Sequence, residues 1–264
     1  LQNVITCFVG LVSNIMIGSY SQDALSGVSL ANQVQFLLQM LAGGLGDGMA
    51  VMTAQYWGTR RLEPIRRVLA IALTFAAVAC GLFFGGAVFA PQGMLRLLTT
   101  DAGAIREGAA YLRLAAFSYP FFTVSMILLA AQRSVENVGV GIAASFSGLL
   151  VNILLSWLLI FGRLGFPALG AQGAAIATIV ARAAECAVVV AYTYGMDHKL
   201  ALTRGCFRRL DRGLLRDFRR FGTPVVMANA SWGLAMLIQT AVLGHLGSNA
   251  IAANAIANSL FQVI

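Results

Sequence analysis

The chain alternates between long apolar runs and short polar segments. A helix of about 20 apolar residues crosses the hydrocarbon core of a bilayer, and a helix in lipid satisfies its own backbone hydrogen bonds. The pattern therefore predicts an all-α polytopic membrane protein with about eight spans. We expect these spans near residues 1–19, 27–56, 68–90, 108–132, 138–161, 171–194, 223–245 and 250–264. The chain is expected to be truncated, because Leu1 opens inside an apolar run and the last run is short.

Composition supports this class and argues against others. Hydrophobic residues make up 59% of the chain and charged residues 11%, with a mean hydropathy of +0.80. Soluble domains carry roughly a quarter charged residues. The charges lie in segments between apolar runs, which argues against a nucleic-acid-binding surface. The four cysteines are scattered singly, so we expect packing residues rather than a metal site or a disulfide framework.

Basic residues are divided unevenly among the predicted loops. The second, fourth and sixth loops hold 13 Lys and Arg residues, whereas the odd-numbered loops hold only three, Arg96, Arg106 and Arg163. Positively charged loops remain on the cytoplasmic side of a membrane. We therefore expect the even loops to be cytoplasmic, in a multi-pass protein of the plasma (inner) membrane.

A motif near the start of the chain returns near its end. Residues 18–32 and 244–258 share the same spacing of short elements, namely Gly18, Asp23-Ala24-Leu25 and Leu30-Ala31-Asn32 against Gly244, Asn249-Ala250-Ile251 and Ile256-Ala257-Asn258. Internal repeats are typical of transporters, and an even number of intervening crossings makes them parallel. The pattern predicts a parallel-repeat, two-lobe transporter with twelve helices in full. We expect an N-terminal six-helix lobe at 1–194, a basic cytoplasmic linker at 195–222, and the first two helices of a C-terminal lobe at 223–264.

The most specific stretch follows the fifth predicted span. It reads Leu164-Gly165-Phe166-Pro167-Ala168-Leu169-Gly170-Ala171-Gln172-Gly173, and the second span ends in Ala54-Gln55-Tyr56-Trp57-Gly58. Over essentially its whole length the chain resembles the multidrug and toxic compound extrusion (MATE) family. The resemblance implies export of amphipathic, often cationic organic compounds by alternating access, driven by inward Na⁺ or H⁺. No resident cofactor is implied.

The resemblance also implies a coupling site in the N-terminal lobe. Asn152 and Ser156 are one turn apart on the same face of a helix, where relatives carry an Asn and commonly an acid. Thr178 is a candidate oxygen ligand that would complete a weak Na⁺ site with them. Helix one offers Ser13 and Asn14, where many relatives carry an acid. The missing acids predict low cation affinity in this lobe.

Few acids lie well inside the predicted spans. Asp47 follows Gln35, Gln39 and Gly43 at four-residue steps, which predicts a polar stripe along one helix. Polar groups in lipid are costly and mark cavities or partners. Asp47 is either a cavity-facing carboxylate that takes a proton or a cationic substrate, or a solvated acid near the cytoplasmic mouth.

Other polar residues on the helices are weaker candidates. Arg182 and Glu185 are three apart and can meet, as a structural ion pair or a gating pair. Helix seven offers Asn229 and Gln239 as substrate contacts. Trp232 on the same helix could stack on an aromatic or cationic compound, or anchor in lipid.

Three alternatives to a drug exporter fit the sequence less well. A lipid-linked oligosaccharide flippase of the same superfamily would carry more cationic residues in its cavity than Arg113 and Arg182. An integral membrane enzyme would need an acid/base pair, metal ligands or a nucleophile at membrane depth, and a scaffold would not need duplicated lobes. We expect a monomeric transporter whose partners are the bilayer and a small organic substrate.

Overall fold

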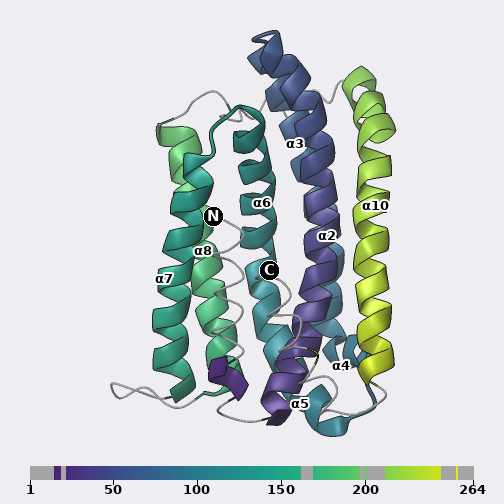
Figure 1. Cartoon of the computed structure of the whole chain (residues 1–264), viewed down its shortest axis with the longest axis vertical. Helices are drawn as coiled ribbons and strands as arrows, with labels where there is room; N and C mark the ends of the chain where they lie inside the picture. The colour runs from purple at the N-terminus through teal and green to yellow at the C-terminus, as the bar shows by residue number, and fades with distance from the viewer. Residues whose placement is uncertain are drawn as a thin grey trace.

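The protein is a bundle of long helices (Figure 1), seen here in a computed structural model that describes residues 15–18, 22–161, 169–196, 200, 212–244 and 254. Within these residues the helices are α2 (Gln22–Gly58), α3 (Leu62–Phe89), α4 (Pro91–Arg96), α5 (Ala102–Ala115), α6 (Tyr119–Ser134), α7 (Gly139–Phe161), α8 (Ala171–Gly195) and α10 (Arg212–Gly244). The predicted spans at 1–19 and 250–264 lie almost wholly outside the described residues.

Six helical spans among the described residues are long and apolar enough to cross a membrane. They match the six predicted spans between residues 27 and 245, which confirms the all-helical membrane fold. One of them, Ala102–Ser134, joins α5 and α6 through a 3₁₀ turn at Ala116–Ser118. Pro120 follows in the first turn of α6, where its missing backbone donor is tolerated. Asp101 is the N-cap of this span: its carboxylate accepts hydrogen bonds from the backbone N–H groups of Gly103 and Ala104 at 2.9 and 3.3 Å.

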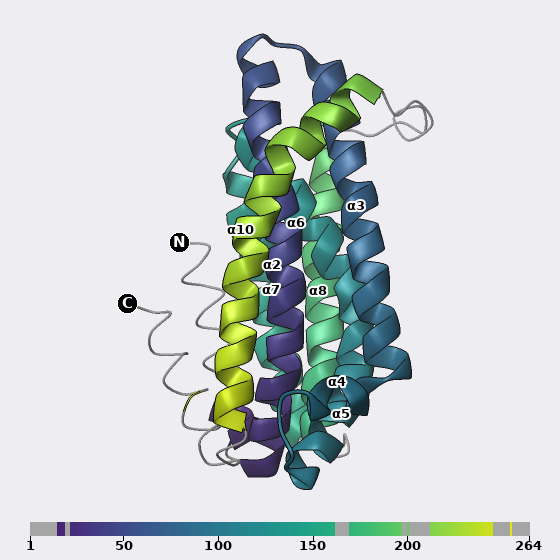
Figure 2. The ribbon, with the colours of Figure 1, turned by 90° about the vertical axis from the view of Figure 1, so that its right-hand side faces the viewer.

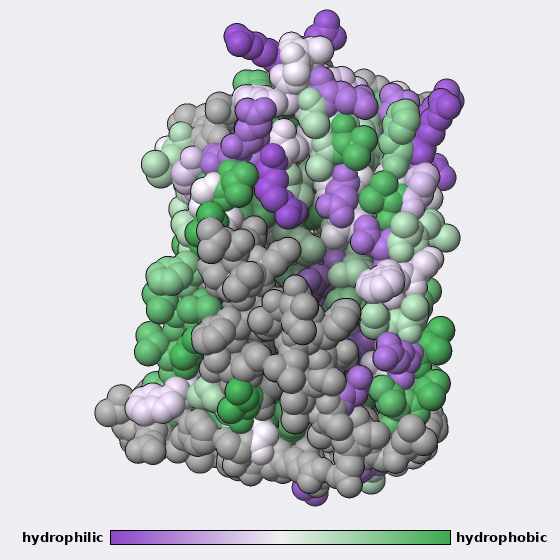
Figure 3. Space-filling model, viewed as in Figure 1, coloured by the Kyte–Doolittle hydropathy of each residue, from purple (hydrophilic) through white to green (hydrophobic). Residues whose placement is uncertain are grey.

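Successive spans run in opposite directions, so alternate loops meet at the same end (Figure 1). The turns from α2 to α3 and from α6 to α7 lie at one end, together with the start of α10; α4 and the start of α5 lie at the other. Hydrophilic side chains gather at the first of these ends (Figure 3). The structure thus places the second and fourth predicted loops at the same end as the start of α10. We call this end the arginine-rich end.

Helix α10 begins earlier than the predicted seventh span. The sequence predicted a span from residue 223, after a linker, whereas residues 212–222 form the first turns of the same helix. Pro224 lies inside α10, and Figure 2 shows the first part of α10 leaning away from the rest, as expected for a helix that continues through a proline. Contact with α2 explains the continuation: a Cβ on Gly48 would lie 2.8 Å from the Gly222 Cα, so the two backbones pack closely.

Buried apolar side chains form two clusters. One, towards the α4–α5 end, includes Leu30, Leu112 and Tyr119; the other, towards the arginine-rich end, includes Met49, Ile127 and Val189. Helix α8 contributes residues up to Ala175 to the first cluster and Val189 to the second. Thr178, Arg182 and Glu185 of α8 therefore lie between the two apolar clusters.

Candidate functional site

Asn152 and Ser156 face the neighbouring helix α8. On α7 they lie between Gly148 and Leu159, which are both close to α8. A Cβ added to Gly148 would be 3.6 Å from the Glu185 Cβ, and a Cβ added to Gly173 would be 2.7 Å from the Leu159 carbonyl oxygen. All four α7 residues fall on one helical face. Asn152 and Ser156 are 7% and 2% exposed. The predicted pair is therefore buried at the α7–α8 interface.

Thr178 lies at the same level of this interface. Because α7 and α8 are antiparallel, with Leu159 beside Gly173 and Gly148 beside Glu185, the stretch from Asn152 to Ser156 passes the turn that carries Thr178. The Thr178 hydroxyl donates to the carbonyl oxygen of Ala174 at 2.9 Å. The Thr178 oxygen can also accept, since a hydroxyl accepts as well as donates. The three predicted Na⁺ ligands thus share one layer of the lobe.

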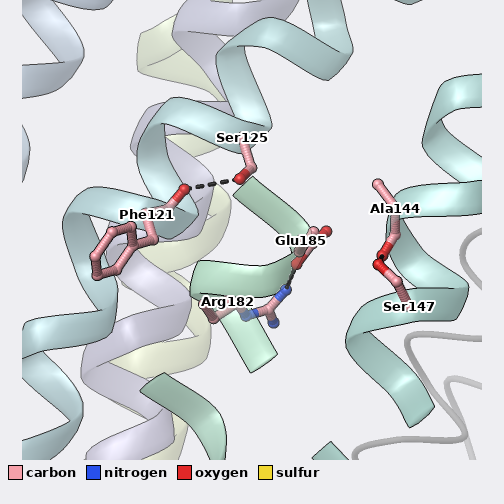
Figure 4. A network of polar contacts seen from close by, with 6 residues as sticks. All are labelled: Phe121, Ser125, Ala144, Ser147, Arg182 and Glu185. Carbon is pink, nitrogen blue, oxygen red and sulfur yellow. Dashed lines mark hydrogen bonds and ion pairs between the residues drawn. The ribbon is translucent and has the colours of Figure 1, made fainter. Parts of the chain in front are cut away.

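One turn beyond Thr178, Arg182 and Glu185 form an ion pair. The Arg182 Nη1 donates to the Glu185 Oε2 at 2.7 Å, with Glu185 between α6 and α7 (Figure 4). The side chains are 26% and 10% exposed, and the guanidinium carbon lies 4.9 Å from the centre of the Phe122 ring. The missing side chain of Gly148 leaves room for the carboxylate, whose Oε2 would be 3.8 Å from a Cβ there. The predicted contact is present within α8, and its two side chains lie beside Phe122 of α6 and Gly148 of α7.

Sequence reasoning missed two members of this layer, Tyr111 on α5 and Asn32 on α2. The Tyr111 hydroxyl donates to the Asn32 Oδ1 at 3.4 Å and interacts with the Thr178 side chain and the Arg182 charge. Tyr111 is 5% exposed. A tyrosine in an apolar run is usually a packing residue; only its hydroxyl, which a buried tyrosine normally pairs, could have signalled a polar role. We call these seven residues the polar layer: Asn32, Tyr111, Asn152, Ser156, Thr178, Arg182 and Glu185.

The donors of the polar layer suit a cation only weakly. Amide and hydroxyl oxygens are the hard ligands that alkali and alkaline-earth cations prefer, and Asn152, Ser156 and Thr178 supply them. Arg182 already brings a positive charge within one turn of Thr178. At about 6 Å and an effective dielectric constant of about 20, two unit positive charges repel by roughly 3 kcal/mol, which Glu185 offsets in part. A cation bound in this layer would therefore be repelled by the Arg182 guanidinium.

Asp47 lies away from this layer, on the open side of α2. Gly43 and Gly46 face Met126 and Ala130 of α6, whereas Gly44 and Gly48 face Asn229 and Gly222 of α10. Asp47 is exposed, and it occupies the helical position between these two packed faces. Gln35 and Gln39 are half-buried. Each four-residue step advances about 40° around a helix, so the predicted stripe turns by about 120° from Gln35 to Asp47.

The predicted residues of α10 divide between two environments. The Asn229 Nδ2 donates to the Val225 carbonyl oxygen at 3.2 Å, and its Cβ would lie 3.3 Å from a Cβ on Gly44, so Asn229 packs in the α2–α10 contact. Gln239 is exposed, and so is Trp232 at 59%. Ser13 and Asn14 lie outside the described residues.

Comparison with known proteins gives one consistent family. A family model described as MatE matches residues 1–158. The chain is 28% identical over 273 residues to "Probable multidrug resistance protein YoeA" of Bacillus subtilis (strain 168), covering 100% of this chain and 58% of that protein. It is 25% identical over 256 residues to "Probable multidrug resistance protein NorM" of Thermotoga maritima, covering 97% and 54%.

Solved structures give the same fold. The structure of "MATE multidrug transporter DinF-BH", solved in complex with a ligand, matches with a TM-score of 0.89 at 23% identity, covering 100% of this chain and 58% of that chain. An "inward-facing conformation of a multidrug resistance MATE family transporter of the MOP superfamily" matches with a TM-score of 0.85 at 22% identity. The chain thus spans a little over half the length of these proteins.

Proposed function

This chain belongs to the MatE family of transport proteins, and from that premise we propose that it functions as a multidrug efflux antiporter. In this proposal the protein exports amphipathic or cationic organic compounds by alternating access, in exchange for Na⁺ or H⁺. Relatives are named multidrug resistance proteins, and one similar structure is that of a multidrug transporter in complex with a ligand. Helices of membrane-spanning length and composition support a multi-pass protein.

The observation that carries the proposal is the position of Asp47. It is a carboxylate well inside an apolar span, exposed on the side of α2 between α6 and α10. A charge at that depth is costly in contact with lipid and stable in a water-filled cavity. An exposed carboxylate in such a cavity attracts cationic compounds and can carry a proton. We therefore infer that this side of α2 lines the substrate route.

Coupling is assigned to the two parts of the molecule that can respond to a cation. The oxygens of Asn152, Ser156 and Thr178 are the proposed weak Na⁺ ligands, and Asp47 is the proposed proton carrier. Arg182 and Glu185 are proposed to hold the polar layer together as a structural pair. The arginine-rich end is proposed to face the cytoplasm of the plasma (inner) membrane, and the transporter is proposed to act as a monomer.

The alternative, a flippase for lipid-linked oligosaccharides, gains no support from the two arginines that the sequence singled out. Arg182 is paired with Glu185. The Arg113 Nε donates to the Val88 carbonyl oxygen at 3.4 Å, near the end of α3. A central cavity that binds pyrophosphate would need unpaired arginines along its walls at membrane depth, whereas Arg182 is paired and Arg113 lies beside the end of α3. This favours export of organic compounds.

The experiment is efflux of a cationic dye from cells that express the protein, with and without a Na⁺ or H⁺ ionophore. We expect wild-type export to fall in one ionophore, and Asp47→Asn to lose at least tenfold in rate for cationic compounds. Glu63→Gln is the matched control, because it removes an exposed carboxylate at the arginine-rich end. Unchanged efflux in Asp47→Asn would exclude Asp47 from the route. Wild-type export no greater than in cells without the protein would refute the transport proposal.

A further inference from the structure

Three arginines that are separate in the sequence meet at the end of the bundle opposite the arginine-rich end. Arg96, Arg106 and Arg113 line a recess of about 550 Å³ with Gln92 and Phe89. A second recess of about 530 Å³ adjoins it and shares Gln92, Arg96 and Arg106. The lining of the first recess comes from α4, from α5 between Arg106 and Arg113, and from Phe89 at the end of α3. Figure 2 shows α4 and α5 beside the end of α3.

The charges of this recess are only partly offset by the described residues around it. Within the part of the chain that the structure describes, no carboxylate lines either hollow. Of the described acids nearby, Glu107 lies 3.7 Å from the Arg106 guanidinium, which is itself 85% exposed. Asp101 is engaged by the backbone N–H groups of Gly103 and Ala104. Three guanidinium groups therefore converge on an open hollow, and arginine matches the geometry of a phosphate better than any other side chain.

An apolar path leads out of the recess along α3. Phe89, Leu82 and Val78 are 87%, 73% and 60% exposed, and their spacing places them on one face of the helix. The twelve residues from Val78 to Phe89 span about 16 Å, close to half of the roughly 30 Å hydrocarbon core. Leu97, next to Arg96, is 77% exposed. A cluster of guanidinium groups at one end of an apolar face as long as one bilayer leaflet matches the headgroup and acyl chains of an anionic phospholipid.

We propose that the recess lined by Arg96, Arg106 and Arg113 binds the phosphate headgroup of an anionic phospholipid, whose acyl chains lie along the Val78–Leu82–Phe89 face of α3. A free phosphate could use the same guanidinium groups but would gain nothing from the apolar face. The site is independent of the transport route proposed above. Binding here also does not depend on which side of the membrane this end faces.

The test uses the purified protein in mild detergent and counts bound lipid by native mass spectrometry. We expect phosphatidylglycerol to be retained at least tenfold more tightly than phosphatidylcholine. Arg96→Gln with Arg106→Gln should abolish that preference, since each charge-assisted hydrogen bond lost is worth about tenfold in affinity. Arg60→Gln with Arg61→Gln removes the same charge from exposed positions at the other end and should leave the preference unchanged.

A second arm separates the lipid from its headgroup. Glycerol phosphate and inorganic phosphate are titrated alone, and we expect both to bind at least a hundredfold more weakly than the diacyl lipid. Equal affinity for inorganic phosphate would overturn the lipid assignment. So would equal retention of phosphatidylcholine, or an equal loss in the Arg60/Arg61 control. Melting curves of both double variants identify any loss that comes from unfolding, and Arg113→Lys, which keeps the charge but not the fork, should weaken binding in a folded protein.

Discussion

The ion pair of the polar layer makes a quantitative prediction about stability. Glu185 has a side chain only 10% exposed, 2.7 Å from Arg182. Arg182→Gln leaves this carboxylate without its partner, and removal of one member of a buried pair costs about 3–5 kcal/mol. Glu185→Gln should cost less, roughly 1–2 kcal/mol, because the Arg182 guanidinium is 26% exposed and keeps the Phe122 ring at 4.9 Å. The neutral double variant should fall well short of the sum, with a coupling of roughly 2–3 kcal/mol.

Thermal unfolding of the detergent-solubilised protein measures this order. At about 2–4 °C per kcal/mol for chains of this size class, Arg182→Gln should lower the midpoint by roughly 10 °C and Glu185→Gln by roughly 4 °C. The double variant should melt above Arg182→Gln. The pair Glu63 and Arg67 is the control, since it is an exposed ion pair within one helix, and such pairs contribute little. Additive shifts, or shifts no larger than in the control pair, would refute the reasoning.

Two further changes test the packing and the polar layer. Gly48→Ala sets a Cβ 2.8 Å from the Gly222 Cα and should destabilise the protein by about 1–3 kcal/mol. Gly81→Ala is the control: a Cβ there meets no atom within 4 Å, so the change should be neutral or stabilising by up to about 1 kcal/mol. Equal melting midpoints for the two variants would contradict the α2–α10 contact. Ser156→Asp adds a full negative charge beside Asn152 and should tighten Na⁺ binding about tenfold, measured as Na⁺-dependent stabilisation; Ser156→Asn is the neutral control, and the absence of any Na⁺ response in Ser156→Asp would contradict the assignment.

The spans could be predicted because a bilayer demands long apolar runs, and such runs are visible without any knowledge of contacts. The unbroken continuation of α10 from residue 212 into the seventh span could not. Its first turns are rich in arginine and precede Pro224, which is typical of a linker, yet the helix continues because the glycines of α2 and α10 let the two backbones pack. That reason depends on two segments far apart in the chain. Periodicity within one segment cannot reveal it.

The same limit applies to the polar layer. Asn152 with Ser156, and Arg182 with Glu185, could be paired from the sequence because each pair lies within one helical turn. The contact between Tyr111 and Asn32 joins residues 79 positions apart, and no local pattern connects them. Charged residues meet the same limit in the arginine recess. The odd-numbered loops hold few basic residues, and only the packing of α4 against α5 brings Arg96 close to Arg106.

The charges of the two candidate regions favour different tasks. In the polar layer Arg182 and Glu185 neutralise each other, and the other members are neutral, so an added cation would leave the layer with a net positive charge. Asp47, by contrast, is exposed on α2 and carries a negative charge that a proton or a cationic compound can neutralise. Neutralisation by either one removes the attraction for the other. We therefore expect a proton and a cationic substrate to exclude each other at Asp47, which is the requirement for exchange in opposite directions, and we expect Na⁺ at the polar layer to act at most as a weak modulator.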